Sequence, residues 1–542
     1  MCIYTCTNIG LTVNIAWKVQ LQNFKDDIYW KNFVEKGGGY SERIQKNNSH
    51  LRKTKKEGKK TVETTTVDTG QKKNQIWALI ITGLMILISA VYYSINVYYI
   101  YVVAYIWFGF AYGMMLQYGR FCFASASRDL FAAGVPRMAV GVLVALMFFS
   151  LIQATLASTN MSTFHPAPFG IHTLIAGLIF GMGMVLAGGC ASGSLYKIGE
   201  GNMTSFLAAF FGLCIGQAVF VDLGGIFDKL VPASWEKSAL IKGLPQYIVN
   251  DGWFDKYLAG YVWDKPSIQL SQTKAISEAL PGISKYFIAD SLLNTLIPAA
   301  LLLTVIYYFF MKKGFMKKRA KEKGGTTGFG DNLAGIWSMI TASKRTTIMG
   351  VIIGTVAGLH ILVMKGLQLK FEVKNFGELL LRMGHKADVS LTGEIFDPGY
   401  WYITSQEGQL GGWILEKFGW NMRDNIFFGI NNGLPVPWRN PALWMSFGII
   451  FGAMVMARLS NEYKFKLPKG ELIVWGLLGG VLMGWGSRPA LGCNIGAFFI
   501  RVAGGDPSGW LYGAGMIGGA FIGVKFFNWW SERKMAKEME AF

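Results

Sequence analysis

The sequence contains little charge for its length. Only 16% of its 542 residues are charged, whereas 52% are hydrophobic and the mean hydropathy is +0.32. The apolar residues gather in runs of roughly twenty, the length that crosses a bilayer core of about 30 Å. A large soluble α-helical enzyme would not combine these features, so the composition predicts a polytopic membrane protein.

Histidine and cysteine are also scarce, with five and six residues respectively. No CxxC or HxxxH spacing occurs, which argues against a preassembled zinc site, and the cysteines are not spaced as a disulfide framework. The sequence has no GxxxxGK[ST] motif, so we expect no ATP hydrolysis by this chain. Few acidic residues fall inside the hydrophobic runs, so no member of a proton relay is evident.

The excess of basic residues gives a net charge of +19 and is concentrated in two places, "LRKTKKEGKK" (Leu51–Lys60) and "MKKGFMKKRAKEK" (Met311–Lys323). A nucleic-acid site would interleave aromatic residues with the basic ones, and these two runs contain only Phe315. Short basic segments beside hydrophobic spans mark the cytoplasmic side and can attract anionic lipid headgroups. We therefore expect the bilayer as a partner, and no nucleic acid.

Ten hydrophobic runs are predicted to be membrane spans. They are Ile76–Val97, Tyr99–Tyr118, Met138–Ala157, His172–Ala187, Ser205–Val221, Ser291–Met311, Thr347–Met364, Pro441–Arg458, Leu472–Gly486 and Trp510–Trp529. Several runs are short or interrupted by glycine, so the expected fold is an all-α polytopic membrane protein with about 9–10 transmembrane helices and short re-entrant half-helices. Ten crossings place both termini in the cytoplasm.

The spans divide the chain into seven parts. These are a basic and largely disordered cytoplasmic tail (1–75), a first transmembrane half (76–222), an extracytoplasmic insert (223–289), a transmembrane pair with a basic cytoplasmic loop at 312–345 (290–366), a second extracytoplasmic insert (367–440), a second transmembrane half (441–530) and a cytoplasmic tail (531–542). Neither insert contains a catalytic motif. The simplest interpretation makes both of them caps over the membrane core.

Two glycine-rich breaks interrupt the spans and repeat each other. The segments are "VLAGGCASGSLYKIGEGN" (Val185–Asn202) and "RPALGCNIGAFFIRVAGGDPS" (Arg488–Ser508), and superposing Cys190 on Cys493 gives an offset of 493 − 190 = 303. Five further glycine pairs then coincide: Gly181 with Gly484, Gly183 with Gly486, Gly189 with Gly492, Gly193 with Gly496, and Gly201 with Gly504. One copy approaches its cysteine from outside and the other from inside, which predicts an inverted repeat.

Irregular backbone at membrane depth occurs only where it is buried in protein or lines a cavity. Glycine there lets a solute approach the backbone, and the half-helix after each cysteine presents free N–H groups and a positive dipole end that suit an anion. The alternative is that the glycines serve tight helix packing. A second match, between "FGFAYGMM" (Phe108–Met115) and "FGIIFGAM" (Phe447–Met454), joins spans that run in the same direction. That match is either coincidental or a sign that one intervening segment is re-entrant.

A third break lies in "QYGRFCFASASRDLF" (Gln117–Phe131), where Cys122 precedes a turn of small residues. The nearby charges Arg120, Arg128 and Asp129 belong either to a cytoplasmic anchor or to the exit path of an anion. Cys2 and Cys6 fall in the tail, and no role is inferred for them.

Cys122, Cys190 and Cys493 each sit where a span meets a break, whereas Cys214 falls inside a span. A thiol in an apolar constriction stays S–H, and this weak, polarizable donor suits a soft partner such as a sulfane sulfur. A thiolate there would repel an anion and would be costly to desolvate. Weak binding at successive sites suits passage, since an ion must leave as readily as it enters. The alternative, that cysteine packs as a small hydrophobe, is preferred for Cys214.

The motifs "YGRFCFASA", "LAGGCASGS" and "ALGCNIGAFF", in this order on a glycine-rich polytopic chain, resemble the YeeE/YedE family. The resemblance covers Trp107–Gly212 and Pro441–Phe527. It implies an hourglass of helices whose short loops converge on a constriction, and uptake of thiosulfate across the bacterial inner membrane. The family's three cysteines correspond to Cys122, Cys190 and Cys493, between which thiosulfate passes by hydrogen bonding without covalent chemistry. A small sulfur-carrier protein of the TusA type is implied on the cytoplasmic side.

The expected substrate-binding residues are the three cysteines and their neighbours in the breaks: Cys122, Cys190, Cys493, Gly189, Gly193, Gly492, Asn494 and Gly496. No cofactor, no metal and no enzymatic activity are expected. The chain departs from the compact family pattern by its basic lead and its two inserts. Some members of the family are linked to selenium, which leaves a selenium-containing solute as an alternative substrate.

Two other classes of function compete with this hypothesis. A soft-metal permease would use the cysteines as Cu(I) ligands, but the 24 methionines are scattered and no Cys/His pairs occur. A membrane sulfurtransferase would carry a persulfide on a thiolate activated by a nearby base. The histidine nearest to Cys190 is His172, at the far end of the preceding span, which argues against that alternative.

Overall fold

A computed structural model of the chain describes residues 56–222, 269–385, 401–422 and 434–540, apart from residues 165, 168, 327, 402, 469 and 491. The first 55 residues of the expected tail, with Cys2 and Cys6, and residues 223–268, 386–400 and 423–433 of the two expected inserts lie outside this description. The chain divides into two units, Met1–Lys73 and Asn74–Phe542. In the first unit the description begins at Lys56, the start of a long helix.

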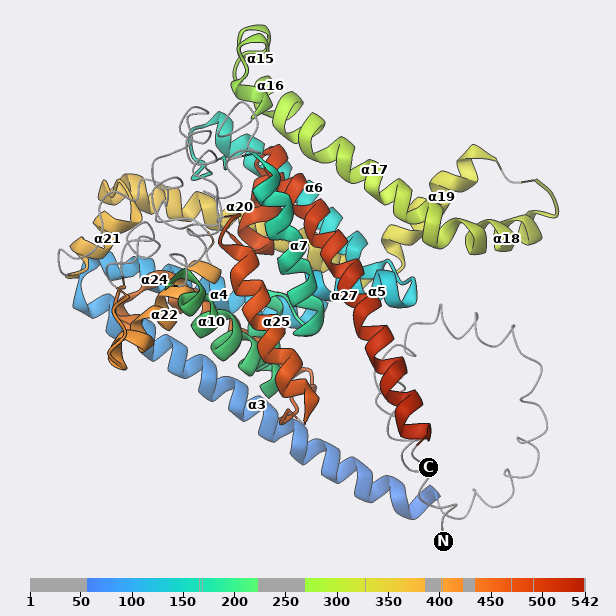
Figure 1. Cartoon of the computed structure of the whole chain (residues 1–542), viewed down its shortest axis with the longest axis horizontal. Helices are drawn as coiled ribbons and strands as arrows, with labels where there is room; N and C mark the ends of the chain where they lie inside the picture. The colour runs from blue at the N-terminus through green and yellow to red at the C-terminus, as the bar shows by residue number, and fades with distance from the viewer. Residues whose placement is uncertain are drawn as a thin grey trace. The chain divides into compact units, whose positions relative to one another are not determined.

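The described residues form helices, turns and loops, and an isolated bridge between Asn202 and Lys466 is their only β-type pairing (Figure 1). The helices are α3 (Lys56–Ile95), η1 (Val97–Tyr99), α4 (Ile100–Gly119), α5 (Phe123–Ala133), α6 (Arg137–Ser158), α7 (Ile171–Leu186), α8 (Ala191–Gly199), α9 (Met203–Phe206), η2 (Leu207–Ile215), α10 (Gly216–Asp222), η4 (Leu270–Gln272), α15 (Lys274–Ala279), α16 (Ile283–Lys285), η5 (Tyr286–Leu296), α17 (Ile297–Ile306), η6 (Tyr307–Met311), α18 (Lys312–Lys323), α19 (Phe329–Thr341), α20 (Lys344–Phe371), α21 (Phe376–Arg382), α22 (Thr404–Lys417), η7 (Pro437–Arg439), α24 (Pro441–Leu459), α25 (Glu471–Ser487), η8 (Asn494–Ile500), α26 (Arg501–Ala503) and α27 (Pro507–Glu540).

Eight helical runs in the described part of the chain are long and apolar enough to cross a membrane. They are Gly70–Ile95, Val97–Ala133, Arg137–Ser158, Ile171–Gly199, Ile283–Lys323, Lys344–Phe371, Pro441–Leu459 and Pro507–Glu540, and three shorter apolar helices cover Met203–Val219, Glu471–Ser487 and Asn494–Ala503. Every one of the ten expected spans coincides with a helix, although two of them are among the shorter ones. The expected all-α polytopic architecture is confirmed.

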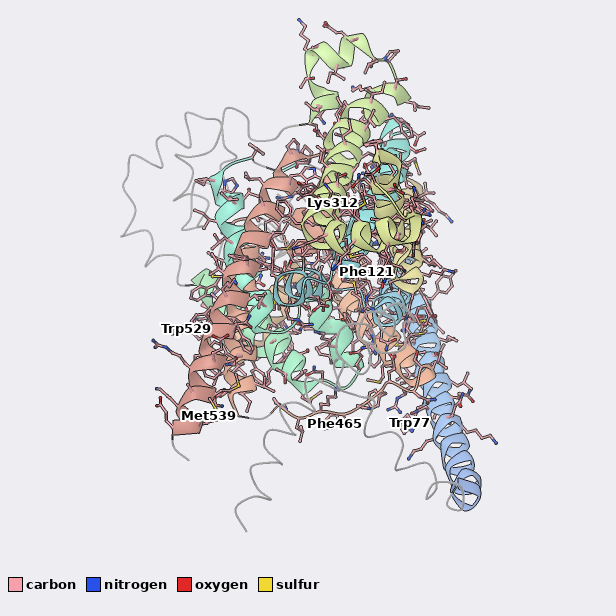
Figure 2. All side chains as sticks on the ribbon, turned by 90° about the vertical axis from the view of Figure 1, so that its right-hand side faces the viewer. Trp77, Phe121, Lys312, Phe465, Trp529 and Met539 are labelled. Atoms are coloured by element: carbon pink, nitrogen blue, oxygen red, sulfur yellow. The ribbon has the colours of Figure 1, made fainter. Side chains whose placement is uncertain are left out.

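Apolar side chains cover the outer faces of several of these helices. On α3, Leu79 is 73% exposed, and on η6 Phe309 is 74% exposed. The tryptophans Trp77 on α3 and Trp529 on α27 also project from the protein surface (Figure 2). Exposed apolar faces of this extent fit contact with lipid tails, and tryptophan is enriched where such faces meet the headgroups.

The repeat is visible in how α7 packs against α25. A Cβ added at Gly183 would lie 2.7 Å from the carbonyl oxygen of Gly479, and one added at Gly486 would lie 2.7 Å from the carbonyl oxygen of Ala176. Adding the offset of 303 to Gly183 and Ala176 gives Gly486 and Gly479, so the two contacts are equivalent. Each copy therefore packs against the other through the same surface. Because higher numbers on α7 meet lower numbers on α25, the two helices run antiparallel, as an inverted repeat requires.

Two other helix pairs, α4 with α24 and α7 with α27, pack in parallel through GxxxG motifs. A side chain at Gly109 or Gly113 would collide with the carbonyl oxygens of Met445 or Ile449 across the interface, and Gly448 and Gly452 are in the reciprocal position. This explains the match between Phe108–Met115 and Phe447–Met454. The match is therefore not coincidental, and the two segments are not copies within the inverted repeat. They provide the two facing surfaces of one close helix contact.

The described part of the second insert reaches the interior of the helix assembly. Helix α22 packs against η2, α10, α24 and α25. Gly411 lies so close to the carbonyl group of Cys214 that any side chain at this position would collide with it. Three polar residues on this helix, Thr404, Gln406 and Gln409, are at most 4% exposed. A segment with the composition of a surface loop therefore forms part of the core.

Candidate functional site

Each of the three predicted cysteines lies directly before a helix and is buried. Cys122 precedes α5, Cys190 precedes α8 and Cys493 precedes η8, and their side chains are at most 2% exposed. All three are free thiols. Cys214 is equally buried, but it lies inside the continuous helical run Met203–Val219. Position at a helix start, rather than burial, distinguishes the three from Cys214.

The breaks at Cys190 and Cys493 have nearly the same backbone conformation. Cys190 has φ −77° and ψ −179°, and Cys493 has φ −90° and ψ −170°. Each sulfur accepts a hydrogen bond from the first turn of the following helix, from the N–H of Gly193 at 3.3 Å and of Ile495 at 3.4 Å. In both copies the thiol therefore caps the half-helix and lies at its positive end.

The glycines around these cysteines allow the chain to fold back tightly. Gly188 has φ +69°, a left-handed conformation that favours glycine. A Cβ at Gly189 would lie 3.1 Å from the Ser194 hydroxyl, and one at Gly492 would lie 2.9 Å from the backbone nitrogen of Ala497. Gly496 is buried in the first turn of η8. Gly189, Gly492 and Gly496 thus shape the breaks through close backbone packing.

The structure brings Cys122 and Cys190 together. Their sulfur atoms are 3.7 Å apart, which is hydrogen-bonding distance for two thiols. A Cβ at Gly193 would lie 2.5 Å from the sulfur of Cys122 and 3.1 Å from that of Cys190. The hydroxyl of Ser192 is a further neighbour, 3.6 Å from the Cys190 sulfur. A pair of thiols and a hydroxyl therefore gather at the start of α8, where Gly193 has no side chain that would fill the space beside them.

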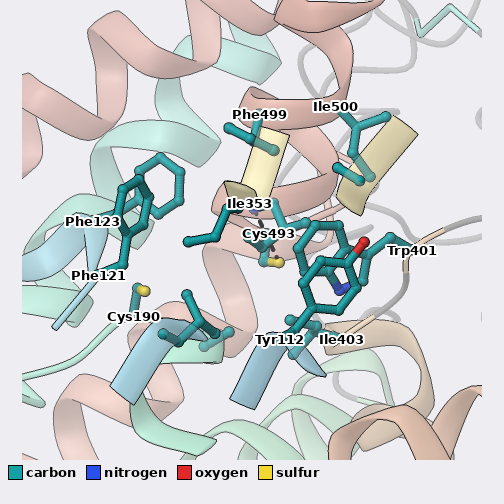
Figure 3. Close-up of a cluster of buried hydrophobic side chains, with 14 of the residues drawn as sticks. Tyr112, Phe121, Phe123, Cys190, Ile353, Trp401, Ile403, Cys493, Phe499 and Ile500 are labelled. Atoms are coloured by element: carbon teal, nitrogen blue, oxygen red, sulfur yellow. Dashed lines mark hydrogen bonds between the residues drawn. The ribbon is translucent and has the colours of Figure 1, made fainter. Parts of the chain in front are cut away.

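Cys493 occupies a different part of the same buried cluster. Figure 3 shows Cys190 and Cys493 within one group of apolar side chains that also contains Tyr112, Trp401 and Phe499. The rings of Tyr112 and Trp401 are stacked with centroids 3.9 Å apart, and Trp401 meets Phe499 edge-on. Both thiols thus face an interior of hydrophobic and aromatic side chains.

Several polar groups near these thiols are buried and have no hydrogen-bond partner among the described residues. They include both amide atoms of Asn494, the hydroxyl of Ser194 and the hydroxyl of Tyr512. The phenol of Tyr512 lies within electrostatic range of both Cys190 and Cys493. Asn494 was expected at the site, whereas Tyr512 was missed because it looks like any other aromatic residue of a span. Buried donors without partners are available to a solute.

A charged network lies at one end of this region, called here the Glu462 end. Arg120 forms an ion pair with Glu462 at 2.9 Å, and Gln117 donates to Glu462 at 2.8 Å and to Glu200 at 3.5 Å. Arg128 pairs with its neighbour Asp129 at 3.0 Å. Arg120 is thus held two residues before Cys122, which leaves both earlier interpretations of this charge open.

A polar cavity of about 340 Å³ lies at the opposite end, called here the Asp290 end after one of its lining residues. Its walls include Gln153, Asn160, Gln272, Asp290 and Gly504, the last at the end of α26. Phe164 lines this cavity and also a narrow apolar gap beside Trp401 and Ile500. The cavity therefore adjoins the aromatic cluster that surrounds Cys493.

The described residues contain no group of three or more His, Cys, Asp or Glu side chains that could hold a metal ion. What they offer instead is a series of weak donors: thiols, hydroxyls, an amide and the N–H groups of half-helix ends. Donors of this kind hold an anion without trapping it. The arrangement is suited to binding and passing a soft anion.

Comparison with known proteins agrees with this chemistry. A protein family described as "Sulphur transport" matches residues 118–522. The thiosulfate transporter TsuA of Spirochaeta thermophila is 27% identical over 406 residues, which cover 74% of this chain and 92% of that protein. TsuA of Escherichia coli is 41% identical over 103 residues (18% and 28% of the two chains), and the probable transporter YedE of Salmonella typhimurium is 32% identical over 139 residues (25% and 33%). The chain belongs to the sulphur transport family, the family of the YeeE/YedE proteins.

Proposed function

We propose that this protein imports thiosulfate across the bacterial inner membrane, passing it between buried thiols. The observation that carries the proposal is the repeated device at Cys190 and Cys493. Each thiol caps a half-helix, and both face one buried cluster. The chain's similarity to the thiosulfate transporter TsuA of Spirochaeta thermophila, which extends over 74% of the chain, supports thiosulfate as the anion.

The distribution of basic residues indicates which end of this region faces the cytoplasm, and import is passage toward that end. Helix α18 has basic residues along its length, and such segments stay on the cytoplasmic side. Helix α20, which follows α18 and α19 in the chain, places Met349 against Gly119, next to Arg120. The Glu462 end is therefore the cytoplasmic end. Thiosulfate enters through the cavity at the Asp290 end, meets Cys493, and passes to the Cys190 and Cys122 pair before it leaves.

Each step of the passage is an exchange of hydrogen bonds. The S–H groups donate to the anion, whose soft terminal sulfur matches their polarizability, and no covalent bond forms. The helix N-termini supply partial positive charge at both breaks. On the cytoplasmic side, a small sulfur-carrier protein of the TusA type is the proposed acceptor of the anion.

The proposal predicts that Cys190→Ala and Cys493→Ala each reduce thiosulfate uptake into proteoliposomes by about ten- to a hundredfold, because one hydrogen bond to a charged group contributes about 1.5–3 kcal/mol. The matched control is Cys214→Ala, which removes an equally buried thiol and should leave uptake near the wild-type rate. Uptake of labelled thiosulfate, competed by sulfate, sulfite and selenite, provides the measurement.

Unimpaired uptake by both cysteine variants would contradict the relay. A stable persulfide on any of the three thiols after turnover, seen by mass spectrometry, would indicate a sulfurtransferase instead. Copper bound in stoichiometric amount to the purified protein would indicate a soft-metal permease.

A further inference from the structure

The acidic residue Glu407 occupies an unusual position on α22. Its side chain is 5% exposed, and both carboxyl oxygens are buried without a hydrogen-bond partner among the described residues. Three neighbouring polar side chains on the same helix each make at least one hydrogen bond. Thr404 accepts from Arg488 at 3.3 Å, Gln406 donates to Ser446 at 3.2 Å, and Gln409 accepts from Asn440 at 3.0 Å. Among these four residues, only Glu407 has no hydrogen-bond partner in the described part of the chain at any of its side-chain polar atoms.

The surroundings of Glu407 link it to the site. Its carboxyl group lies within electrostatic range of the thiols of Cys493 and Cys214. Three residues before α22 begins, Trp401 packs in the cluster around Cys493 (Figure 3). The second insert therefore supplies both an aromatic wall and a carboxyl group to the region through which the anion is proposed to pass.

Among the described residues, the titratable and charged groups nearest to Glu407 are few. Helix η2 contributes Cys214, the turn before η8 contributes Cys493, and the end of α25 contributes Arg488, which is bound to Thr404 and Ser487. Helix α24 contributes the uncharged Ser446, the hydrogen-bond partner of Gln406. Among the described residues no cation is bonded to Glu407, so its ionisation carries a desolvation cost that a neighbouring anion increases.

We propose that Glu407 binds a proton together with the anion at Cys493 and so couples thiosulfate import to protons. This inference rests on the proposed function. An anion beside Cys493 repels a carboxylate, so anion binding favours the protonated acid, and by linkage protonation favours anion binding to the same extent. Release of the anion toward the cytoplasm removes the repulsion and lets the proton leave.

The test uses the full chain in proteoliposomes with a pH gradient, acidic outside, and labelled thiosulfate. The wild type should accumulate thiosulfate, by up to about tenfold per pH unit for each proton coupled, since one pH unit per proton corresponds to about 1.4 kcal/mol. Glu407→Gln should lose this accumulation while it still exchanges internal for external thiosulfate without a gradient. Glu416→Gln, the same substitution at the partly exposed end of α22, is the matched control and should behave like the wild type.

Full pH-driven accumulation by Glu407→Gln would overturn the proposal. A second measurement uses only the wild type and so does not depend on how the variant folds. A pH dye inside the vesicles should report acidification when thiosulfate enters. A steady internal pH during thiosulfate uptake would also overturn the proposal. Failure of the proposed function has a different signature, because wild-type vesicles would then show no thiosulfate exchange at all.

Discussion

The two breaks at Cys190 and Cys493 share a backbone and differ in their neighbours. Both thiols cap a half-helix, and the carbonyl oxygens of both cysteines accept a bond of 2.7 Å from the residue four positions on. Around Cys190 lie a second thiol at 3.7 Å and a hydroxyl. Around Cys493 lie aromatic rings, an unpartnered amide and, within electrostatic range, the carboxyl group of Glu407.

The difference shows which features the repeat determines. Backbone geometry and helix packing follow the offset of 303 residues, because the same glycines permit the same close contacts in both copies. Side-chain chemistry does not follow it, since Cys122 and α22 come from segments outside the two copies. The symmetric frame therefore holds one thiol beside a second thiol and another near an acid, so the two proposed binding places differ in their chemistry.

The largest expected effect is the loss of thiosulfate uptake on oxidation, which should affect the two thiol environments differently. Diamide, which removes two electrons and two protons from a pair of thiols, should join Cys122 to Cys190, since their sulfurs are already 3.7 Å apart. Cys493 should remain a free thiol. We expect thiosulfate uptake to stop on oxidation and to return on reduction, with the Cys122–Cys190 disulfide identified by peptide mapping.

Alkylation of Cys493 after oxidation is the internal control, because it shows that this thiol has stayed unpaired. A disulfide between Cys190 and Cys493, or full uptake with the Cys122–Cys190 disulfide formed, would show that the thiols are arranged differently from this description.

A smaller effect tests the symmetry of the frame. Gly183→Ala and Gly486→Ala each place a methyl group 2.7 Å from a carbonyl oxygen of the facing helix. Each should lower the free energy of unfolding by about 1–3 kcal/mol, the usual cost of overpacking, and the two losses should be similar. Thermal unfolding in detergent provides the comparison.

Gly518→Ala on α27 is the control, since no atom lies within 4 Å of the added methyl group. It should leave the unfolding temperature unchanged or raise it slightly, because alanine favours a helix more than glycine does. A clear inequality between Gly183→Ala and Gly486→Ala would show that the two contacts are not equivalent.

Much of this architecture could be predicted from sequence. The spans follow from the length of the apolar runs, and the breaks at Cys190 and Cys493 follow from glycines that interrupt those runs at matching positions. The antiparallel contact of α7 with α25 is what the direction of the two copies predicts. The three cysteines were singled out for the same reason, because each stands where a span ends abruptly.

The remaining features depend on contacts that have no local signal. The sequence around Glu407, "TSQEGQLGG", is polar and glycine-rich like a surface loop, and only its packing against η2 shows that it is buried. Tyr512 is an ordinary aromatic residue of a span until its hydroxyl is found near two thiols. The match between Phe108–Met115 and Phe447–Met454 conflicts with the inverted repeat only if the two segments are copies of each other. A close parallel contact between two helices produces the same sequence match, and only the structure distinguishes the two cases.

The central claim is that thiols at two helix breaks hold the same anion in one buried path. Crystals soaked in thiosulfate and measured at long wavelength, where sulfur scatters anomalously, would test it most directly. We predict anomalous peaks from bound thiosulfate beside the sulfurs of Cys493 and of the Cys122–Cys190 pair. Thiosulfate found only on the surface, with neither break occupied, would contradict the account.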